Sequence, residues 1–267
     1  MIRKVQDHQA KIGNKRRVDR HGLILLLCLL VSPSASADTV NVAVAANFVP
    51  TMRLIEAEFE AISVHRINLI SGSSGKHFAQ ILNGAPYHLL LSADQERVEL
   101  LKLQSPESVI SSKTYAIGRL ALWSRQSEIS LGPDHLQRAD NYNRLAIANP
   151  NLAPYGRAAM EALGSMGLSR QALSEKLVFG ENVGQAFQYA YSGNADLGLV
   201  AHSQLISSNV SGSYWILPES LHSPIQQDVA LLDSSEASRS LYQYLSSETA
   251  IQIILQNGYE LAEPGGR

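Results

Sequence analysis

The segment from Gly72 to His77 reads GSSGKH, and its glycines, hydroxyls and cations could serve three kinds of chemistry. These are a nucleotide phosphate loop, a serine nucleophile, or a binding site for one small anion. A phosphate loop needs the spacing G-x-x-x-x-G-K-[ST]. Here Gly72 and Gly75 enclose only two residues, and His77 stands where Ser or Thr should follow Lys76. The spacing therefore disfavours a nucleotide site.

A serine hydrolase that used Ser73 or Ser74 stays as a remote alternative. The segment lacks the G-x-S-x-G frame of a nucleophile elbow. His77, one turn along the predicted helix, is the nearest general base. No third group that would orient this histidine is visible in the sequence. An anion-binding site needs neither a general base nor an orienting group, because the free N–H groups and hydroxyls of a helix start can bind the anion. The simplest alternative is an ordinary serine N-cap in a tight turn.

These residues must be positioned by a regular alternation of strands and helices. Apolar, β-branched runs predict strands, and stripes such as Met52, Ile55 and Phe59 predict core-facing helices. The alternation predicts an α/β fold with largely parallel sheets. One long helix is expected from about Ser235 to Gln256. The predicted strands lie in residues 39–46, 67–70, 88–94, 114–124, 144–150, 177–183, 195–204, 214–218 and 226–232.

Ligands of such folds bind beyond the carboxyl ends of the strands. The residues expected there are small or neutral and polar, with one tyrosine. They include no cluster of His, Cys, Asp and Glu at ligand spacing, which disfavours a metal site. No paired carboxylates stand out either, so the pattern favours binding over catalysis. The residues at the strand ends are Ala46-Asn47, Ser73-Ser74, Ala153 to Gly156, Asn182-Val183 and Ala201-His202.

The N-terminal residues 1–37 have the order of a secretory signal peptide. A basic stretch precedes the apolar run LILLLCLLV, and Ala35-Ser36-Ala37 offers a cleavage site after Ala37. The apolar run is too short to span a bilayer as a helix. Cys28, the only cysteine, would be removed, so no disulfide is expected. Arg16-Arg17 hints at twin-arginine export, but the general secretory route is favoured.

Cleavage would leave an acidic protein. Residues 1–37 hold seven of the 22 basic residues and two of the 24 acidic residues, which leaves 15 basic and 22 acidic residues. The resulting net charge of −7 disfavours binding to nucleic acid or to an anionic membrane surface. If the protein binds an anion, local dipoles must hold it against this overall charge.

Six ordered segments of the predicted mature chain resemble the periplasmic molybdate-binding proteins of ABC importers. The combination of NGAP followed by SAD, and the run NPNLAPYG, carry the resemblance most specifically. The segments are VAVAANFVPTMRLIEAEFE, SGSSGKHFAQILNGAPYHLLLSAD, YAIGRLALWS, AIANPNLAPYG, GENVGQAFQYAYSGNADLGLVAHSQ and PIQQDVALL.

The resemblance implies a type II periplasmic binding-protein fold, with two Rossmann-like lobes, a hinge of two crossing strands and a ligand cleft between the lobes. Lobe 1 would comprise residues 38–117 and 228–267, and lobe 2 residues 118–227. The resemblance also implies a periplasmic monomer that has no enzyme activity and no cofactor. It would not insert into the membrane, and it would deliver its ligand to a membrane permease.

The resemblance further implies a molybdate or tungstate ligand, with molybdenum bound as the oxyanion and without direct metal ligands. Carried over by motif, the contacts fall on Ala46 and Val183 through their backbones and on Asn47, Ser73, Ser74 and Tyr155. Some relatives have a ligand-contacting tyrosine in a late strand, where this sequence has Ala201. Lys76 is expected to be a solvated helix lysine, and His77 a surface or supporting histidine.

Sulfate, phosphate or a broader range of oxyanions remain alternatives, because all of these ligands are tetrahedral. Phosphate carries a proton at neutral pH and needs an acceptor in the site. No carboxylate lies among the six matched positions, which argues against phosphate. Sulfate is the harder competitor, since cavity size and donor placement would have to distinguish it.

Overall fold

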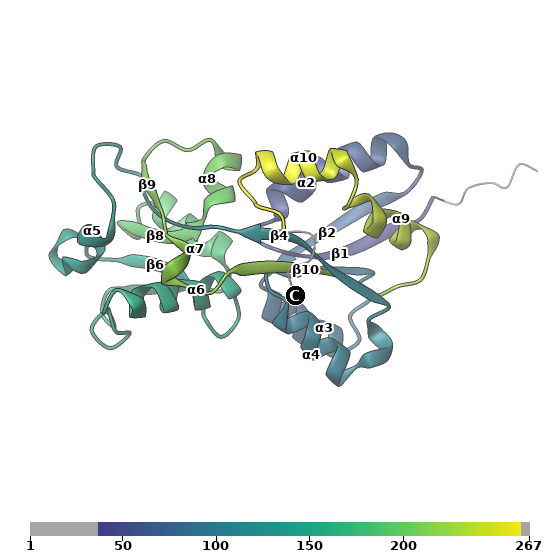
Figure 1. Cartoon of the computed structure of the whole chain (residues 1–267), viewed down its shortest axis with the longest axis horizontal. Helices are drawn as coiled ribbons and strands as arrows, with labels where there is room; N and C mark the ends of the chain where they lie inside the picture. Colours follow the sequence, from purple (N-terminus) through teal and green to yellow (C-terminus); the bar gives the residue numbers. More distant parts are fainter. Residues whose placement is uncertain (1–36, 263–267) are drawn as a thin grey trace, which may run out of the picture. The chain divides into compact units, whose positions relative to one another are not determined.

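Two five-stranded sheets organise residues 37–262, the part of the chain that the computed structural model describes (Figure 1). Apart from Ala37, the predicted signal peptide lies outside the described residues, as do residues 263–267. The first sheet has the strand order β2-β1-β3-β10-β4. Its strands are β1 (Thr39–Ala45), β2 (Arg66–Gly72), β3 (Leu89–Leu91), β4 (Ser111–Gly118) and β10 (Ile225–Leu231).

The second sheet has the order β7-β6-β8-β5-β9. Its strands are β5 (Leu120–Ser124), β6 (Leu145–Ala148), β7 (Leu177–Gly180), β8 (Leu197–Ala201) and β9 (Ser213–Ile216). We call the first sheet and its helices lobe 1, and the second sheet and its helices lobe 2. The lobe boundaries expected from the sequence stay a prediction.

Lobe 1 carries five α-helices: α2 (Val49–Ile62), α3 (Ser74–Leu82), α4 (Glu96–Gln104), α9 (Glu236–Tyr244) and α10 (Glu248–Gln256). Lobe 2 carries four: α5 (Pro133–Gln137), α6 (Pro154–Ser165), α7 (Val183–Tyr191) and α8 (His202–Ser208). Three short 3-10 turns at 106–108, 139–141 and 219–221 complete the described elements.

Strand β1 is buried on both faces because helices cover both sides of its sheet. Its residues Val40, Val42 and Val44 pack with α2 and α10, whereas Ala43 packs with Val98 of α4. Figure 1 accordingly shows α2 and α10 on one side of the sheet and α3 and α4 on the other. In lobe 2, alternate residues of β6 pack in the same way against α6 and α7. This explains the continuous apolar runs in the sequence.

Both sheets are mixed, but four of the five strands in each sheet run in the same direction, so the expectation of largely parallel sheets is confirmed except for one reversed strand in each. Strand β1 pairs in parallel with β2 and β3, but β10 runs antiparallel to both β3 and β4. In lobe 2, β6 is parallel to β7 and β8, whereas β5 is antiparallel to β8 and β9. The reversed strand of each sheet is one by which the chain crosses between sheets, because the chain enters lobe 2 through β5 and returns to lobe 1 through β10.

The segment 114–124, expected to be one strand, contributes to both sheets. Strand β4 ends at Gly118 in the first sheet, and β5 begins at Leu120 in the second. Arg119, between them, forms ion pairs with Glu219 and Glu260. One uninterrupted β-rich sequence therefore crosses between the lobes, which its apolar pattern alone does not show.

The expected long terminal helix is two helices, α9 and α10. Ser247 has extended backbone angles and caps the second helix, because its hydroxyl accepts a hydrogen bond from the N–H of Ala250 at 3.2 Å. A serine at an N-cap competes with helix continuation for this kind of backbone hydrogen bond. The apolar stripe continues across the break, which is why the sequence pattern suggested a single helix.

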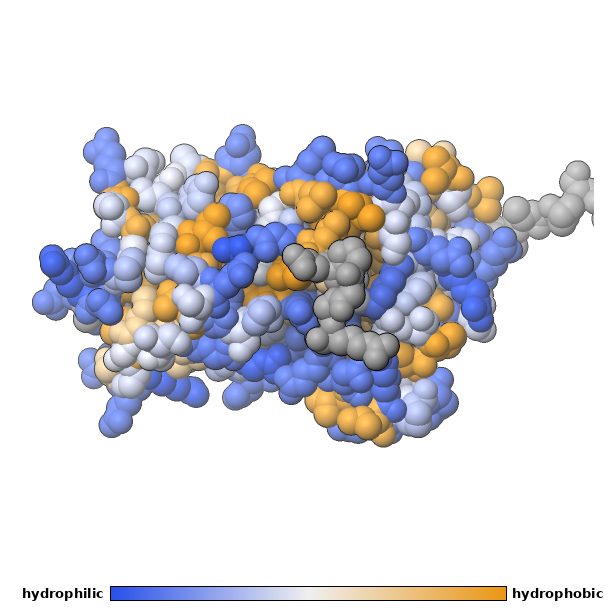
Figure 2. Space-filling view, in the orientation of Figure 1, coloured by the Kyte–Doolittle hydropathy of each residue, from blue (hydrophilic) through white to orange (hydrophobic). Residues whose placement is uncertain are grey.

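Hydrophilic residues predominate on the face seen in Figure 2, and hydrophobic residues form separate patches among them. Within residues 37–262, no helix is both long and apolar enough to span a membrane.

His77 is a buried residue that joins α3 to β1, and not a surface histidine. Only 1% of its surface is exposed. Its Nε2 lies 3.2 Å from the carbonyl oxygen of Val44, and its Nδ1 lies 3.2 Å from Oε1 of Gln80. Gly72 leaves room for the ring, because a Cβ there would lie 2.8 Å from Nε2. Burial is the main cause that lowers the pKa of His77 below 6.5, although the two hydrogen bonds oppose it.

This lowered pKa predicts a loss of stability in acid. The unfolded chain binds a proton to His77 at about pH 6.5, before the folded chain does, so protonation favours unfolding. The destabilisation that His77 causes is absent at pH 8 and grows as the pH falls below about 6.5. We expect the free energy of unfolding, measured by urea titration from pH 8 to pH 5, to fall more steeply for the wild type than for His77→Gln. Equal slopes would contradict the assignment.

Candidate functional site

The six residues expected to bind the anion lie at the ends of parallel strands, where the two lobes meet. In lobe 1, β1 and β2 end side by side, with Ala45 opposite Gly72, and Ala46-Asn47 and Ser73-Ser74 follow them. In lobe 2, β6 and β7 end together, and Tyr155 and Val183 lie at the starts of the following helices. Five of the six are 1–3% exposed, and Ala46 is half-buried: Asn47, Ser73, Ser74, Tyr155 and Val183 are the buried ones.

Among the described residues, the hydroxyl hydrogens of Ser73 and Ser74 find no protein acceptor. Ser73 caps α3, and its Oγ accepts a hydrogen bond from the N–H of Lys76 at 3.3 Å. The Oγ of Ser74 accepts from the N–H of Ala93 at 2.9 Å. Since a hydroxyl can accept and donate at once, each can also donate to a third group. This arrangement suits an acceptor ligand.

Helix starts supply backbone donors at the same place. Asn182 caps α7 through a hydrogen bond from Gln185 to its side chain, which leaves Val183 as the first helical residue. The first N–H groups of a helix have no acceptor within the helix. Among the described residues, the N–H groups of Ser74, Val183 and Asn47 find no protein acceptor. Each helix start also carries about half a positive charge.

Two of the expected donors are used within the protein. The N–H of Ala46 donates to the carbonyl oxygen of Gly72 at 2.9 Å. The side-chain nitrogen of Asn47 donates to Gln227 at 2.9 Å and to Tyr259 at 3.1 Å. In this structure the Asn47 donor that remains for a ligand is its backbone N–H.

The side chain of Tyr155, in lobe 2, extends to Gly118 at the end of β4. Its hydroxyl is buried and has no hydrogen-bond partner within residues 37–262, and the same holds for Nε2 of Gln227. Burial, and then the neighbouring Tyr259, raise the pKa of Tyr155 well above its usual value, while the side chain of Gln227 acts in the opposite direction. Tyr155 is therefore a neutral hydroxyl, and not a phenolate, throughout the physiological pH range.

The lobes touch through backbone atoms beside these residues. The N–H of Gly75 donates to the carbonyl oxygen of Leu152 at 2.9 Å. A Cβ on Gly75 would lie 2.9 Å from that oxygen, so the approach depends on glycine. On the α7 side, a Cβ on Gly184 would lie 3.4 Å from the Cβ of Ala46. The helix starts of both lobes are therefore held against each other.

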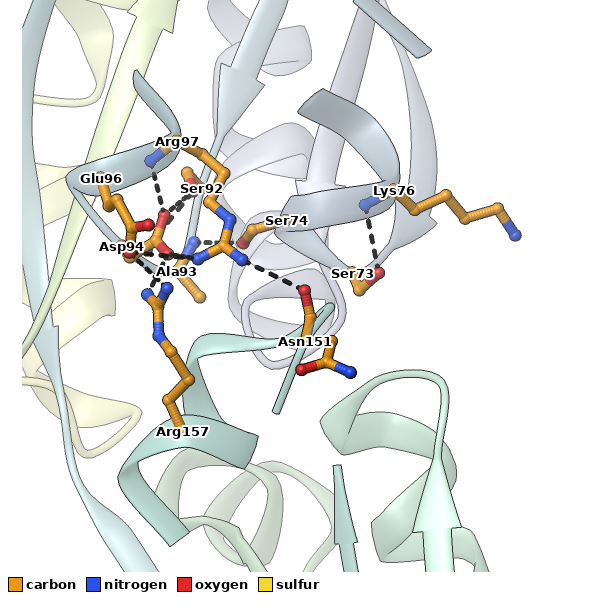
Figure 3. A network of polar contacts seen from close by, with 10 residues as sticks. All are labelled: Ser73, Ser74, Lys76, Ser92, Ala93, Asp94, Glu96, Arg97, Asn151 and Arg157. Carbon is orange, nitrogen blue, oxygen red and sulfur yellow. Dashed lines mark hydrogen bonds and ion pairs between the residues drawn. The ribbon is translucent and has the colours of Figure 1, made fainter. Parts of the chain in front are cut away.

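Charged side chains also bridge the lobes, at the edge of this contact (Figure 3). Arg157 of α6 forms ion pairs with Glu96 and, at 2.5 Å, with Asp94. Arg97 donates to the same Asp94 carboxylate at 2.6 Å and to the carbonyl oxygen of Asn151 at 3.4 Å. Both arginines are thus paired with carboxylates and are not free cations for a ligand.

Lys76 is exposed, as expected for a helix lysine, and it adds a further bridge. Its Nζ lies 2.8 Å from the carboxylate of Glu181 in lobe 2. No local pattern in the sequence indicates this pairing, because the partners lie 105 residues apart. In Figure 3 the lysine side chain extends away from Ser73 and Ser74.

A cavity of about 330 Å³ opens between the lobes near the ion pairs, lined among others by Ala93, Asp94, Pro154, Arg157 and Ile225. It lies beside the buried serines and does not include them. Within residues 37–262, no group of three or more His, Cys, Asp and Glu residues could hold a metal ion.

The serine–histidine pair that a hydrolase would need does not form. Both ring nitrogens of His77 lie against Val44 and Gln80, and neither contacts the hydroxyl of Ser73 or Ser74. The two hydroxyls accept hydrogen bonds from backbone N–H groups instead. What the site offers is a set of neutral hydrogen-bond donors.

Sequence reasoning missed the residues that support this site from within. Gln227 lies in the predicted strand of residues 226–232, and no sequence pattern marks it as a site residue. The same holds for Tyr115 and Tyr259. Nothing local in the sequence could have found them, because their hydrogen bonds to Gln227 and Asn47 span 112 and 212 residues.

Comparisons with known proteins agree with this architecture. The chain is 37% identical over 237 residues to the molybdate-binding protein ModA of Azotobacter vinelandii, covering 87% of this chain and 94% of that protein. It is 36% identical over 238 residues to ModA of Rhodobacter capsulatus, covering 88% and 93%. The solved structure of the periplasmic molybdate-binding protein of A. vinelandii matches with a TM-score of 0.78 at 34% identity, covering 84% of this chain and all of the other.

These likenesses confirm the predicted fold, an α/β protein with two lobes of the periplasmic binding-protein kind. The profile described as "Bacterial extracellular solute-binding protein" matches residues 40–260, which is nearly all of the described chain. With its donors gathered where two lobes meet, this chain belongs to the family of bacterial extracellular solute-binding proteins.

Proposed function

We propose that this protein binds molybdate, and also tungstate, in the periplasm and delivers it to the permease of an ABC importer. The observation that carries the proposal is the composition of the site: neutral donors from both lobes, with every nearby cation paired to a carboxylate. The relatives that share 36–37% of its residues are named molybdate-binding proteins, which supports the choice of ligand.

Helix starts and hydroxyls can hold a dianion without a full positive charge. Hydrogen bonds to a charged group contribute about 1.5–3 kcal/mol each. The proposed ligand contacts are the N–H groups of Asn47, Ser74 and Val183 and the hydroxyls of Ser73, Ser74 and Tyr155. If the site instead used an unpaired lysine or arginine, that cation would be buried in the ligand-free protein at a large desolvation cost. Neutral donors avoid that cost.

In this proposal the protein is a monomer that captures its ligand and catalyses no reaction. Residues 1–37 direct it to the periplasm, and no cofactor takes part. Lobe 1 is assigned to residues 38–117 and 228–267 and lobe 2 to 118–227, with β4–β5 and the approach to β10 as the hinge. Closure of the two lobes on the ligand is the motion that this fold permits.

Thermal unfolding with different oxyanions tests the ligand. A ligand at a thousand times its dissociation constant stabilises the folded state by about 4 kcal/mol. For a chain of this size that raises the melting temperature by about 2–4 °C per kcal/mol. We expect large shifts with molybdate and tungstate and small ones with sulfate and phosphate. Equal shifts with sulfate would indicate a broader oxyanion carrier, and no shift with any of them would refute the proposal.

Ser74→Ala tests the serine donor. Because Ser74 would donate to a charged ligand, its loss should weaken molybdate binding by about tenfold to a hundredfold. Isothermal titration calorimetry gives the dissociation constant. Ser247→Ala, at the N-cap of α10, is the matched control, since it costs about 1 kcal/mol of stability but lies in a different part of lobe 1. A Ser74→Ala variant with unchanged affinity would remove Ser74 from the site.

Gly75→Ala tests the contact between the lobes. The new Cβ would meet the Leu152 carbonyl oxygen at 2.9 Å and force the lobes apart. We expect about tenfold or greater loss of molybdate affinity, with the stability of the ligand-free protein unchanged or raised, because alanine favours a helix over glycine by about 1 kcal/mol. Gly164→Ala, in α6 with open space around its Cβ, should keep full affinity. Equal affinities of the two variants would argue against this contact in the bound state.

A further inference from the structure

Two buried polar atoms that have no hydrogen-bond partner in the described part of the chain lie close together at the hinge. They are Oη of Tyr155 and Nε2 of Gln227. Both occupy the space above Gly118: a Cβ on Gly118 would lie 2.1 Å from the tyrosine oxygen and 2.7 Å from the glutamine nitrogen. A buried polar group without a partner costs about 1–3 kcal/mol, so such a pair at a ligand site calls for a function.

The hydrogen-bond network behind Gln227 fixes which way its amide points. The carbonyl oxygen of Asn47 can only accept, so the 2.8 Å contact with Tyr259 uses the single hydroxyl hydrogen of Tyr259. The oxygen of Tyr259 must then accept from the side-chain nitrogen of Asn47, at 3.1 Å. The second hydrogen of that nitrogen goes to Oε1 of Gln227, at 2.9 Å.

Oε1 of Gln227 also lies 3.1 Å from the hydroxyl of Tyr115, whose single hydrogen can go to this oxygen or to the carbonyl oxygen of Ser92 at 3.4 Å. Because the nitrogen of Asn47 donates to the amide oxygen of Gln227, the amide nitrogen must face the other way, toward Tyr155. An amide NH2 group can only donate. In this structure the two groups do not form a hydrogen bond. In any hydrogen bond that they do form, Tyr155 can only accept, which leaves its own hydrogen for another acceptor.

We propose that Gln227 is the positioning residue that holds the Tyr155 hydroxyl as a hydrogen-bond donor to the bound oxyanion. At the Tyr155 end, the site then offers hydrogens and no acceptor. It favours a fully deprotonated tetrahedral anion over one that carries a proton, such as hydrogen phosphate. The inference rests on the proposed function, because it assigns a source of selectivity to that same site.

A double-mutant cycle tests the coupling of the two residues. Tyr155→Phe and Gln227→Met are each expected to weaken molybdate binding about tenfold or more. If Gln227 acts through the tyrosine hydroxyl, the double variant should bind no more weakly than Tyr155→Phe alone. Gln226→Met, on the neighbouring residue of β10, should bind like the wild type. If the double variant lost molybdate affinity by the product of the two single losses, the two residues would act independently, and the proposal would be overturned.

Gln227→Glu provides a second measurement, the ratio of molybdate to phosphate affinity. A residue with a purely structural role would leave this ratio unchanged. The substitution keeps the shape of the side chain, but a carboxylate accepts the tyrosine hydrogen and turns the tyrosine oxygen into an acceptor. We expect molybdate affinity to fall and the ratio of molybdate to phosphate affinity to narrow by about tenfold or more. An unchanged ratio in a folded variant would overturn the selectivity role.

Titrations of the wild type distinguish a failure of the proposed Gln227 role from a failure of the proposed function. If the wild type binds molybdate and the cycle shows no coupling, the role of Gln227 fails while the proposed function stands. If the wild type binds none of the oxyanions, both fail. Melting temperatures of all variants show whether they fold, and Gln227→Glu still tests the proposal if Gln227→Met does not.

Discussion

The constraint on which the site depends is that an acidic protein must hold an anion without a free cation. Backbone N–H groups can do this only where helices begin, and only when several helix starts face one point. The two sheets meet this requirement, because β1 and β2 end together in lobe 1 and β6 and β7 end together in lobe 2. Each strand end leads into a helix whose start faces the other lobe.

The charged residues close to the site serve the contact between lobes. Arg97, Arg157 and Lys76 are all paired with carboxylates, and two of the three pairs join the lobes. The Lys76–Glu181 pair is exposed and contributes little stability, whereas Asp94 and Arg97 are buried. The Gly75–Leu152 backbone hydrogen bond adds to these pairs. A contact made of a few hydrogen bonds and ion pairs agrees with the closure of the two lobes on the ligand that we propose.

Local physical chemistry let the sequence predict much of this protein. Apolar runs bounded by small polar residues marked the strands and the helix starts that follow them, because burial on both faces of a sheet leaves a continuous apolar pattern. The α/β class followed from their alternation, and the segments that meet at the site were those expected at strand ends. The sequence failed where local patterns are ambiguous, as at the break between α9 and α10.

Tertiary structure alone decided the arrangements that join distant residues. Whether a strand runs parallel or antiparallel depends on where the chain crosses between sheets, so the mixed sheets left no trace in the apolar pattern. The burial of His77 depends on its contact with β1. Above all, the orientation of the Gln227 amide follows from its hydrogen bond with Asn47, which lies far away in sequence. The sequence supplies these donors and acceptors, but only folding brings them within reach of one another, because a hydrogen bond acts over about 3 Å.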